Sequence, residues 1–292
     1  FAATGEVICY FKARPVFVDI EMDTCNINVN KIEEKITQKT RAIIPVHHGG
    51  QPCDMDEIME IARRYNLFVI EDAAHALPSF YKGKKIGTIG DITCFSFYAT
   101  KPLATGEGGM LCTDNEEWAE RVKVMRLHGI GKDAWKRYSK EGSWYYEVSM
   151  LGYKYNMTDI QAALGIEQLK KLEFMYEKRK MIAKRYTEAF KDVEEIITPI
   201  IKDDRNTSWH LYPIKLRTKG IRNSLIEELK ERGIGTSVHF IPLYRFPFYK
   251  ENFHYDPSDF PNCEWVYERI VSLPIYPGMT DKEVDYVIEN II

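Results

Sequence analysis

The chain has 292 residues, of which 45% are hydrophobic, 28% charged and 13% aromatic. This length is typical of about two domains, and the composition excludes an intrinsically disordered chain. The formal net charge of −3 argues against a global positive field that could hold a nucleic acid or an anionic membrane. We therefore expect small-molecule or protein partners, with no nucleic acid and no membrane among them.

No apolar run approaches the ~20 residues that a bilayer-spanning helix needs. The 6 cysteines are scattered, without the C-x-x-C pairs of zinc or redox sites, so we expect reduced thiols, no metal centre and a cytoplasmic protein. The chain begins with Phe1 rather than Met, and a strand at 14–19 would open the domain without an earlier partner. These two features indicate that an upstream segment is missing.

Apolar strand patterns alternate with helical patterns in the first half of the chain. Helices are predicted from Asp54, with Glu57 in capping-box spacing, and over 115–128. Continuous apolar strands of this kind predict a parallel sheet covered on both faces, whose ligands bind at the carboxyl ends of the strands. The predicted strands span 14–19, 42–46, 67–70, 92–97 and 110–113.

A long helical pattern, with Thr158 and Gln161 in capping-box spacing, runs to about residue 190 and bridges two predicted units. Beyond it the pattern predicts strands over 209–216 and 236–240, a helix over 223–233 and terminal helices, the last of which begins at Thr280 with Glu283 in capping-box spacing. We therefore expect a large α/β domain over 1–192, including the bridging helix at about 158–190, and a smaller α+β domain over 193–292.

Lys101 and Asp72 are the residues whose positions indicate a catalytic role. Lys101 follows the apolar strand at 92–97, where loss of solvation would lower the pKa of its amine and make it available for Schiff-base formation. Asp72 ends the preceding strand, where a carboxylate could keep the ring nitrogen of pyridoxal phosphate protonated. Taken singly, Lys101 could equally be a solvated turn lysine, and Asp72 a helix N-cap.

Several motifs in consecutive order resemble the DegT/StrS family of sugar-nucleotide aminotransferases, and the resemblance extends over the whole chain. The motifs are Val69-Ile-Glu-Asp-Ala-Ala-His-Ala76, Gly90-Asp91, Phe95-Ser-Phe-Tyr-Ala-Thr-Lys101, Gly106-Glu-Gly-Gly109 and Leu151-Gly-Tyr-Lys-Tyr-Asn-Met-Thr-Asp159.

The resemblance implies the α/β fold of fold-type-I pyridoxal phosphate aminotransferases, with a mostly parallel sheet in the large domain. It implies that Lys101 binds the cofactor covalently and that Asp72 pairs with the pyridine nitrogen. By the same resemblance, His75 lies near the phenolic oxygen of the cofactor and Ser96 binds its phosphate. Phe1 matches the aromatic residue that stacks on the pyridine ring.

In the family, the segment around Lys154 and Asn156 reaches the cofactor phosphate of the neighbouring subunit, which implies a homodimer with shared active sites. Many relatives have Asn and Arg at these two positions. The Lys and Asn found here resemble the enzymes that make 4-amino-4-deoxy-L-arabinose for lipid A. On an extended strand, residues two apart face the same side, so either Lys154 or Asn156 could reach the phosphate. His239 resembles a histidine near the sugar site, although an interface role is an equal alternative.

The family's activity implies amino transfer from an amino acid, glutamate by resemblance, to a nucleotide-linked keto sugar. A dehydratase branch replaces the lysine at position 101 with histidine, so dehydration is a lower-ranked alternative. An inactive or regulatory cofactor-binding scaffold is another, because the family's N-terminal phosphate-binding turn precedes the position of Phe1. His47 and His48 are interpreted as loop residues, since no carboxylate or cysteine spacing for a metal accompanies them.

Overall fold

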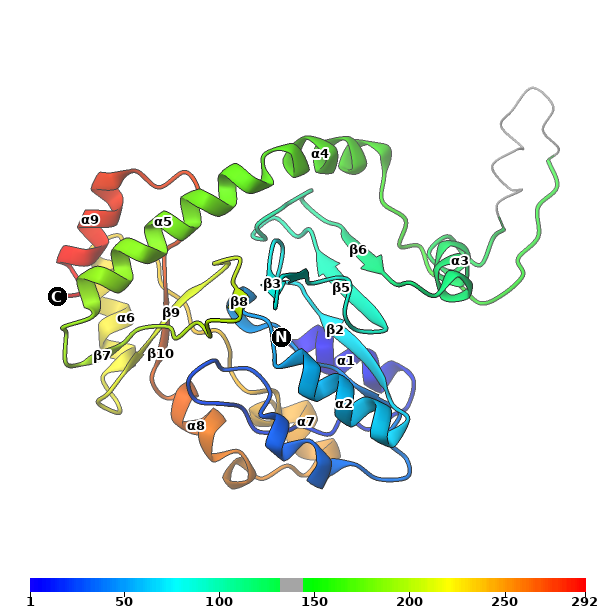
Figure 1. The fold of residues 1–292 in the computed structure, drawn as a ribbon, viewed down its shortest axis with the longest axis horizontal. Coiled ribbons are helices and arrows are strands. Elements are labelled where there is room, and N and C mark those ends of the chain that lie inside the picture. Colours follow the sequence, from blue (N-terminus) through cyan, green and yellow to red (C-terminus); the bar gives the residue numbers. More distant parts are fainter. Residues whose placement is uncertain (132–143) are drawn as a thin grey trace.

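The computed structural model describes residues 1–131 and 144–292. Its central sheet has the order β1-β2-β5-β6 (Figure 1). β1, β2 and β5 run parallel, and β6 pairs with β5 in the antiparallel direction. The predicted mostly parallel sheet is thus confirmed, and its strands span Ala42–Ile43, Phe68–Asp72, Ile92–Ser96 and Gly109–Cys112.

One hydrophobic core lies between this sheet and helix α2, Met55–Tyr65. Apolar residues recur on one face of α2, where Ile58 and Ala62 are buried against Val69 of β2, as the helical period requires. Helices α1 (Ala2–Tyr10) and α3 (Glu116–Met125) are further elements of this part. Within 1–131 and 144–292, none of the helices combines the length and apolarity needed to cross a bilayer.

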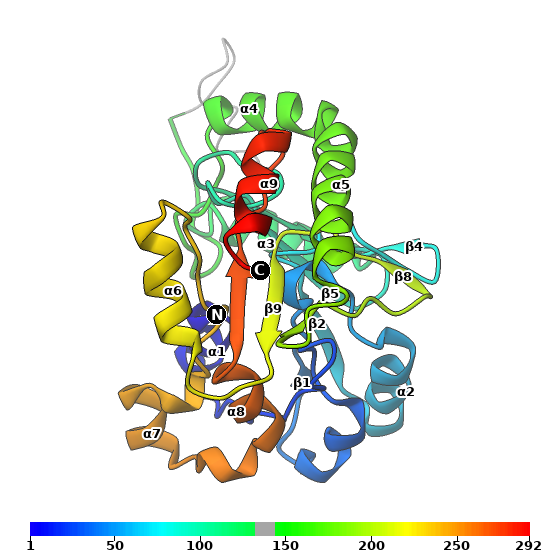
Figure 2. The ribbon, with the colours of Figure 1, turned by 90° about the vertical axis from the view of Figure 1, so that its left-hand side faces the viewer.

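A second core surrounds an antiparallel sheet with the order β10-β9-β7. Figure 2 shows β9 and β10 side by side, with α6 on one side and α5 on the other. Buried side chains from α5, β9 and α9 meet in this core. The elements span Leu172–Phe190 (α5), Ile196–Ile197 (β7), Tyr212–Leu216 (β9), Arg222–Glu231 (α6), Ile270–Leu273 (β10) and Asp281–Glu289 (α9).

A small sheet joins the two halves of the chain. It has the order β4-β3-β8, in which β3 (Phe80–Tyr81) pairs with both β4 (Lys84–Lys85) and β8 (Arg205–Asn206). Helices α7 (Pro247–Phe253) and α8 (Pro261–Tyr267) follow in the C-terminal part. The division into domains at residues 192 and 193 stays a prediction.

The predicted bridging helix at about 158–190 is two helices rather than one. α4 (Asp159–Lys170) and α5 are separated at Lys171, whose φ of −98° and ψ of −4° interrupt the regular helix. The capping box of Thr158 and Gln161 is present at the start of α4. Thr280 and Glu283 form the same motif at the start of α9, so both sequence signals mark true helix starts.

Two predicted strands are wrong. Residues 14–19 form no ladder, and the carboxylate of Asp19 instead accepts hydrogen bonds from the backbone of Asn262 and Cys263. Residues 236–240 contribute only an isolated bridge between Ser237 and Ser272. In 14–19 only Pro15 and Asp19 are buried, and in 236–240 no residue is buried. Neither apolar run is therefore packed as a core strand, and an apolar pattern alone does not require a partner strand.

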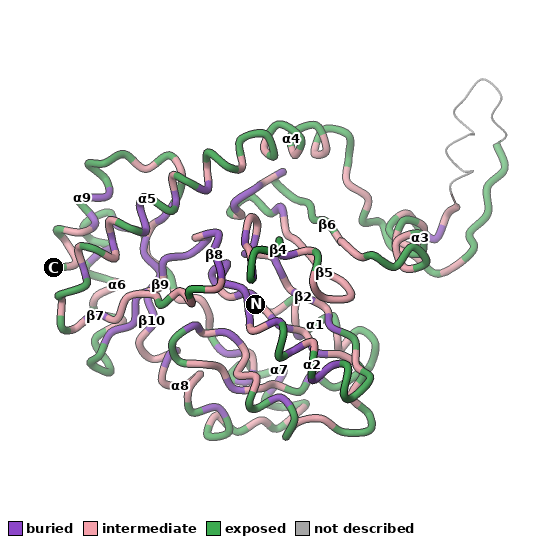
Figure 3. The backbone as a smooth tube through the Cα atoms, in the orientation of Figure 1, coloured by how far each residue is buried: buried purple, intermediate pink, exposed green. Residues whose placement is uncertain are grey.

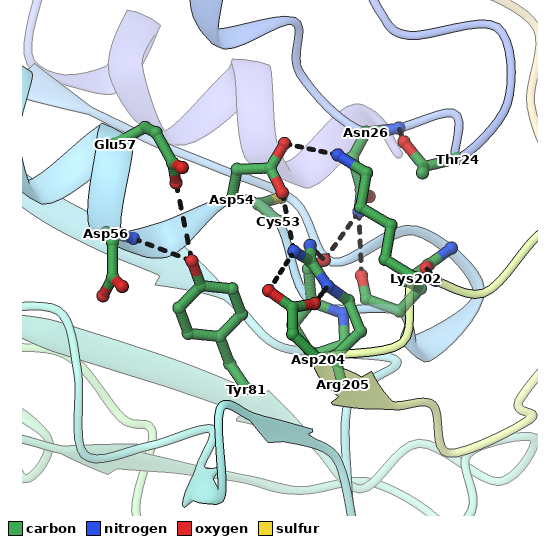
Figure 4. Close-up of polar contacts among 12 residues, drawn as sticks. Thr24, Asn26, Cys53, Asp54, Asp56, Glu57, Tyr81, Lys202, Asp204 and Arg205 are labelled. Carbon is green, nitrogen blue, oxygen red and sulfur yellow. Dashed lines mark hydrogen bonds and ion pairs between the residues drawn. The ribbon is translucent and has the colours of Figure 1, made fainter.

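Asp54 precedes α2 as predicted, but its carboxylate does not cap the helix. One oxygen accepts from Arg205 at 2.7 Å and the other from Lys202 at 2.7 Å (Figure 4). Arg205, whose side chain is 2% exposed, also contacts Asp204 at 2.6 Å. This ion-pair cluster fastens β8 to the start of α2 and displaces the capping box, because a buried guanidinium needs charged partners.

Arg205→Ala should lower the free energy of unfolding by about 3 kcal/mol, since it removes a guanidinium that is 2% exposed from the partly buried carboxylates of Asp54 and Asp204. Chemical denaturation followed by circular dichroism measures this loss. Arg64→Ala is the matched control, because Arg64 pairs with Glu33 and Glu60 while its side chain is 53% exposed. We expect a loss of at most about 1 kcal/mol there. Equal losses in both variants would contradict the role given to burial.

Candidate active site

The candidate site forms where β2 and β5 end, at the carboxyl edge of the parallel strands. β2 ends at Asp72, and β5 ends at Ser96, followed by a turn that carries Lys101. The backbone N–H of Lys101 donates to the carbonyl of Tyr98 at 2.9 Å. Thr105 closes the turn with a 2.8 Å bond from its backbone N–H to the carbonyl of Phe97. Lys101 is thereby held on a folded turn at the edge where ligands of such sheets bind.

Lys101 and Asp72 lie within electrostatic range of each other. Burial lowers the pKa of the Lys101 amine below its ordinary value, while the negative charge of Asp72 raises it. Burial is the larger effect, so the pKa is lowered overall. A lowered pKa increases the neutral fraction of the amine, which is the form that acts as nucleophile or base.

Both carboxylate oxygens of Asp72 accept hydrogen bonds from the chain. The Thr4 hydroxyl donates to Oδ2 at 2.6 Å, and the backbone N–H of Ala74 donates to Oδ1 at 3.1 Å. Thr4 belongs to α1, 68 residues away in the sequence. The distance to Thr4 is that of a charge-assisted O–H···O⁻ bond.

His75 lies three residues after Asp72 and belongs to a group of stacked rings. Its imidazole centroid is 4.4 Å from that of His210 and 5.8 Å from the ring of Phe240, to which it is stacked. His75 and His210 are 5% and 9% exposed. In the described part of the chain, the Nδ1 atoms of both are buried without a hydrogen-bond partner.

His239 and His48 complete this histidine cluster, which we define as His48, His75, His210 and His239. His239 Nδ1 is 2.9 Å from the hydroxyl of Ser272. His48 Nε2 is 3.0 Å from the carbonyl of His239; because a carbonyl only accepts, this nitrogen of His48 carries the proton. The four residues of the cluster lie far apart in the sequence, and the fold brings their imidazole rings together.

The histidine cluster is uncharged near neutral pH. Burial lowers the pKa of His48 and of His239 to about 4. Burial also brings the pKa values of His75 and His210 well below the ordinary range, and the charge of Lys101 adds to the lowering in both. Lys101 therefore faces neutral imidazoles that can donate and accept hydrogen bonds.

Glu71 and His47 form a fully buried pair directly beneath the site. His47 Nε2 lies 2.8 Å from Glu71, and both side chains are 0% exposed. Because the backbone N–H of Cys53 donates to His47 Nδ1 at 3.1 Å, it is Nε2–H that donates to Glu71. Glu71 also accepts from Thr93 at 2.7 Å and from the backbone of Gly90 at 2.8 Å. Although burial raises the pKa of Glu71, these hydrogen bonds bring it below its ordinary value overall.

Phe1 and Ser96 lie at the margin of this arrangement. The Phe1 backbone nitrogen is within electrostatic range of Asp72 and Lys101, and its ring, 68% exposed, lies 6.0 Å from that of Phe240. Ser96 accepts a 3.3 Å hydrogen bond from the backbone of Tyr98. Phe1, Asp72, His75, Lys101 and His239 are therefore brought together, with Ser96 at the end of β5.

Lys154 and Asn156 lie on a separate, exposed segment beside α3. Lys154 forms a bridge with Leu127, and its amine donates to the Asn156 side chain at 2.5 Å. Figure 1 shows this segment running beyond β6, away from the N-terminal end of α1. Within one chain, these two residues are not gathered with Lys101 and Asp72.

Sequence reasoning missed Thr4, His210 and His48 as neighbours of the site. Thr4 lies on a helix with no motif of its own, and His210 reaches the site from the start of the second core. The interpretation of His48 as a loop residue is wrong, because His48 begins a short 3-10 helix over His48–Gly50 and contacts His239. When polar residues from distant segments contact each other, no spacing pattern in the sequence around either residue predicts the contact.

Comparisons with known proteins agree with this arrangement. Residues 1–292 match the DegT/DnrJ/EryC1/StrS aminotransferase family. The chain is 63% identical to the uncharacterised protein MJ1066 of Methanocaldococcus jannaschii and 52% identical to the spore coat polysaccharide biosynthesis protein SpsC of Bacillus subtilis. Both matches cover 100% of this chain and 76% of the relative.

Solved structures give the same result. PseC of Helicobacter pylori, an aminotransferase involved in the biosynthesis of pseudoaminic acid, matches with a TM-score of 0.92 and 32% identity over 100% of this chain and 76% of its own. The PMP-form of Spr1654 from Streptococcus pneumoniae matches with a TM-score of 0.92 and 34% identity over 99% and 78%. The expected aminotransferase fold is therefore confirmed, and the chain belongs to the DegT/DnrJ/EryC1/StrS aminotransferase family.

Proposed function

We propose that the chain binds pyridoxal phosphate at the edge formed by β2 and β5 and uses it to transfer an amino group to a nucleotide-linked keto sugar. The observation that carries this proposal is the meeting of Lys101 and Asp72, an amine of lowered pKa and a carboxylate, at one edge of the sheet. Spr1654, a structural relative, has been solved in PLP and PMP forms, which supports the choice of cofactor.

The residues present fit this cofactor. The buried Nδ1 of His75 lacks a partner among the described residues, and a buried polar atom left unsatisfied is costly unless a ligand pairs with it. The phenolic oxygen of the cofactor is a group that His75 could contact. Lys101 would hold the aldehyde carbon, Asp72 the pyridine nitrogen and Ser96 the phosphate, while Phe1 would stack on the ring.

When bound, pyridoxal phosphate supplies an electron sink that stabilises negative charge on the carbon next to the amine. Asp72 keeps that sink effective by holding a proton on the ring nitrogen. Lys101 is the group that could take a proton from Cα of the amino donor and return it, since burial lowers the pKa of its amine and so favours the neutral form. The rings of His75 and Phe240 are stacked with their centroids 5.8 Å apart and would limit the access of water to one side of the site.

We assign glutamate as amino donor and a nucleotide-linked keto sugar as acceptor. SpsC is a polysaccharide biosynthesis protein, and PseC acts in the biosynthesis of pseudoaminic acid, so sugar amination is the coarser function that these relatives support. His239 stands beside Lys101 with its Nε2 free of the bond to Ser272, in a place where it could bind a sugar hydroxyl. The product would be an amino sugar nucleotide for cell-surface polysaccharide or glycoconjugate synthesis.

We further propose a homodimer in which each subunit completes the other's site. Figure 3 colours most of the segment at 144–156 and of helix α4 as exposed, and several of these exposed residues are large and apolar. Trp144, Leu151 and Ile160 are 85%, 86% and 84% exposed, and no residue of α4 is buried. Exposed apolar surface on this scale marks an interface, and its continuity with Lys154 and Asn156 indicates a second copy of the chain as the occupant.

A cytoplasmic location is the final part of the proposal. All 6 cysteines are free thiols in the structure, and Cys53 is buried with its pKa raised by burial. Free thiols of this number are typical of a reducing compartment, which is also where nucleotide-linked sugars would be available.

Lys101→Ala should abolish covalent cofactor binding. The wild-type protein with pyridoxal phosphate should show a visible absorption band that glutamate bleaches, and borohydride reduction should place the cofactor on the peptide containing Lys101. The variant should lose the band and slow amino transfer by at least about 10²-fold, the usual worth of a positioned acid–base group. A band that persists in the variant would remove Lys101 from its role, and a stable protein without any band would favour the scaffold alternative.

A panel of nucleotide-linked keto sugars, incubated with glutamate and analysed by mass spectrometry, tests the substrate class. We expect one or more sugars to gain an amino group in exchange for the keto oxygen, with 2-oxoglutarate formed in equal amount. Loss of water from the sugar without 2-oxoglutarate would instead support a dehydratase. Free keto sugars lacking the nucleotide are the matched controls and should react more slowly.

Mixing two inactive variants tests the shared site. Lys101→Ala lacks the amine, and the double variant Lys154→Ala/Asn156→Ala lacks the arm that would serve its partner. Randomly mixed subunits should recover about a quarter of wild-type activity, because half of the dimers are mixed and each of these has one intact site. A mixture as inactive as its components would contradict sharing, as would a wild-type protein that sediments as a monomer.

A further inference from the structure

Asp72 is fixed by contacts of two kinds. Its backbone N–H donates to the carbonyl of Pro45 at 2.9 Å, and its own carbonyl accepts from the backbone of His47 at 3.1 Å. These bonds, together with pairing to Cys94, set the position of the main chain. They leave rotation of the carboxylate about its own bonds to be fixed by other groups, since the torsion at a carboxylate is broad.

The Thr4 hydroxyl supplies that second kind of contact. It donates to Asp72 Oδ2 at 2.6 Å. A threonine in a helix commonly turns its hydroxyl back onto the carbonyl of the preceding turn. Here the hydroxyl is directed at a carboxylate on another element.

The place of Thr4 is itself closely determined. The neighbouring Gly5 is buried, and a Cβ there would lie 2.5 Å from the hydroxyl of Tyr249 and 2.9 Å from a methyl carbon of Leu243. Helix α1 therefore packs so close to these side chains that only glycine fits at position 5. This contact sets the depth of α1 and so the distance from Thr4 to Asp72.

We propose that Thr4 is a positioning residue: it orients the Asp72 carboxylate toward the pyridine nitrogen of the cofactor. The inference rests on the proposed function of Asp72. A hydroxyl has one proton to donate, so Thr4 occupies one lone pair of Oδ2 and leaves the carboxylate free to accept another N–H. The bond from Ala74 to Oδ1 holds the second oxygen, and the two bonds together define the plane of the group.

Replacement of the hydroxyl separates orientation from packing. Thr4→Val keeps the shape of the side chain and removes the donor, and Thr4→Ser keeps the donor. We expect the Thr4→Val holoenzyme to release pyridoxal phosphate about tenfold faster on dialysis, the effect of losing one hydrogen bond to a charged group. Its visible band should also shift. Thr4→Ser should restore both properties to within about twofold of the wild type.

A double-variant cycle identifies the residue through which Thr4 acts. If Thr4 acts through Asp72, Thr4→Val should add nothing to the cofactor release rate of Asp72→Asn, since contacting residues that share one role are non-additive. Thr187→Val is the matched control, because it removes a 2.8 Å contact between Thr187 and Tyr212 in the second core. Its release rate should equal that of the wild type, whatever its unfolding midpoint.

The outcomes keep the two hypotheses apart. Unchanged cofactor release and spectrum in Asp72→Asn would overturn the proposed function of Asp72. Faster release in Asp72→Asn with normal release in Thr4→Val would overturn the positioning role alone. Additive effects in the double variant, or a Thr4→Ser variant as impaired as Thr4→Val, would also overturn that role, since either would mean that Thr4 acts by packing.

Discussion

The site depends on how a pair of adjacent acids at the end of β2 is divided between two environments. Successive side chains of a strand point to opposite faces, so Glu71 and Asp72 cannot share a role. Glu71 is turned into the protein, where His47, Thr93 and Gly90 satisfy it. Asp72 consequently faces Thr4 and Lys101. Moving either acid by one position would place an unpaired charge in the core, which is a severe cost; the register of β2 is thereby fixed.

The sequence was sufficient for the features that are local or ordered along the chain. The strand ends at Asp72 and before Lys101 follow from apolar runs closed by polar residues, and the helix starts at Thr158 and Thr280 follow from capping boxes that the structure contains. Asp54 shows the limit of such signals. Its spacing to Glu57 predicts a capping box, yet the carboxylate binds Arg205, about 150 residues later. A buried ion pair outweighs a cap worth about 1 kcal/mol.

The same distinction explains the candidate site. Lys101, Asp72 and His75 lie in motifs and were predicted from them, although their roles toward a cofactor remain predictions. Thr4 and His210 reach the site only through the packing of α1 and of the segment before β9. His210 lies just before β9, and no motif around it in the sequence indicates a partner such as His75. Contacts of this kind depend on how the two hydrophobic cores are arranged. Hydrophobic periodicity predicts single helices and strands, but it does not predict that arrangement.

Neutral histidines beside Lys101 give the site its electrostatic character. Burial keeps the four imidazoles uncharged near pH 7, so they do not add positive charge next to the amine. They also do not compete with Lys101 for the carboxylate of Asp72, whose two oxygens are bound by Thr4 and Ala74. If one imidazole gained a proton, its charge would lower the pKa of Lys101 further and attract Asp72 away from its orientation. Burial of the histidine cluster thus keeps positive charge away from Lys101 and Asp72. The buried Glu71–His47 pair fixes the end of β2 that carries Asp72.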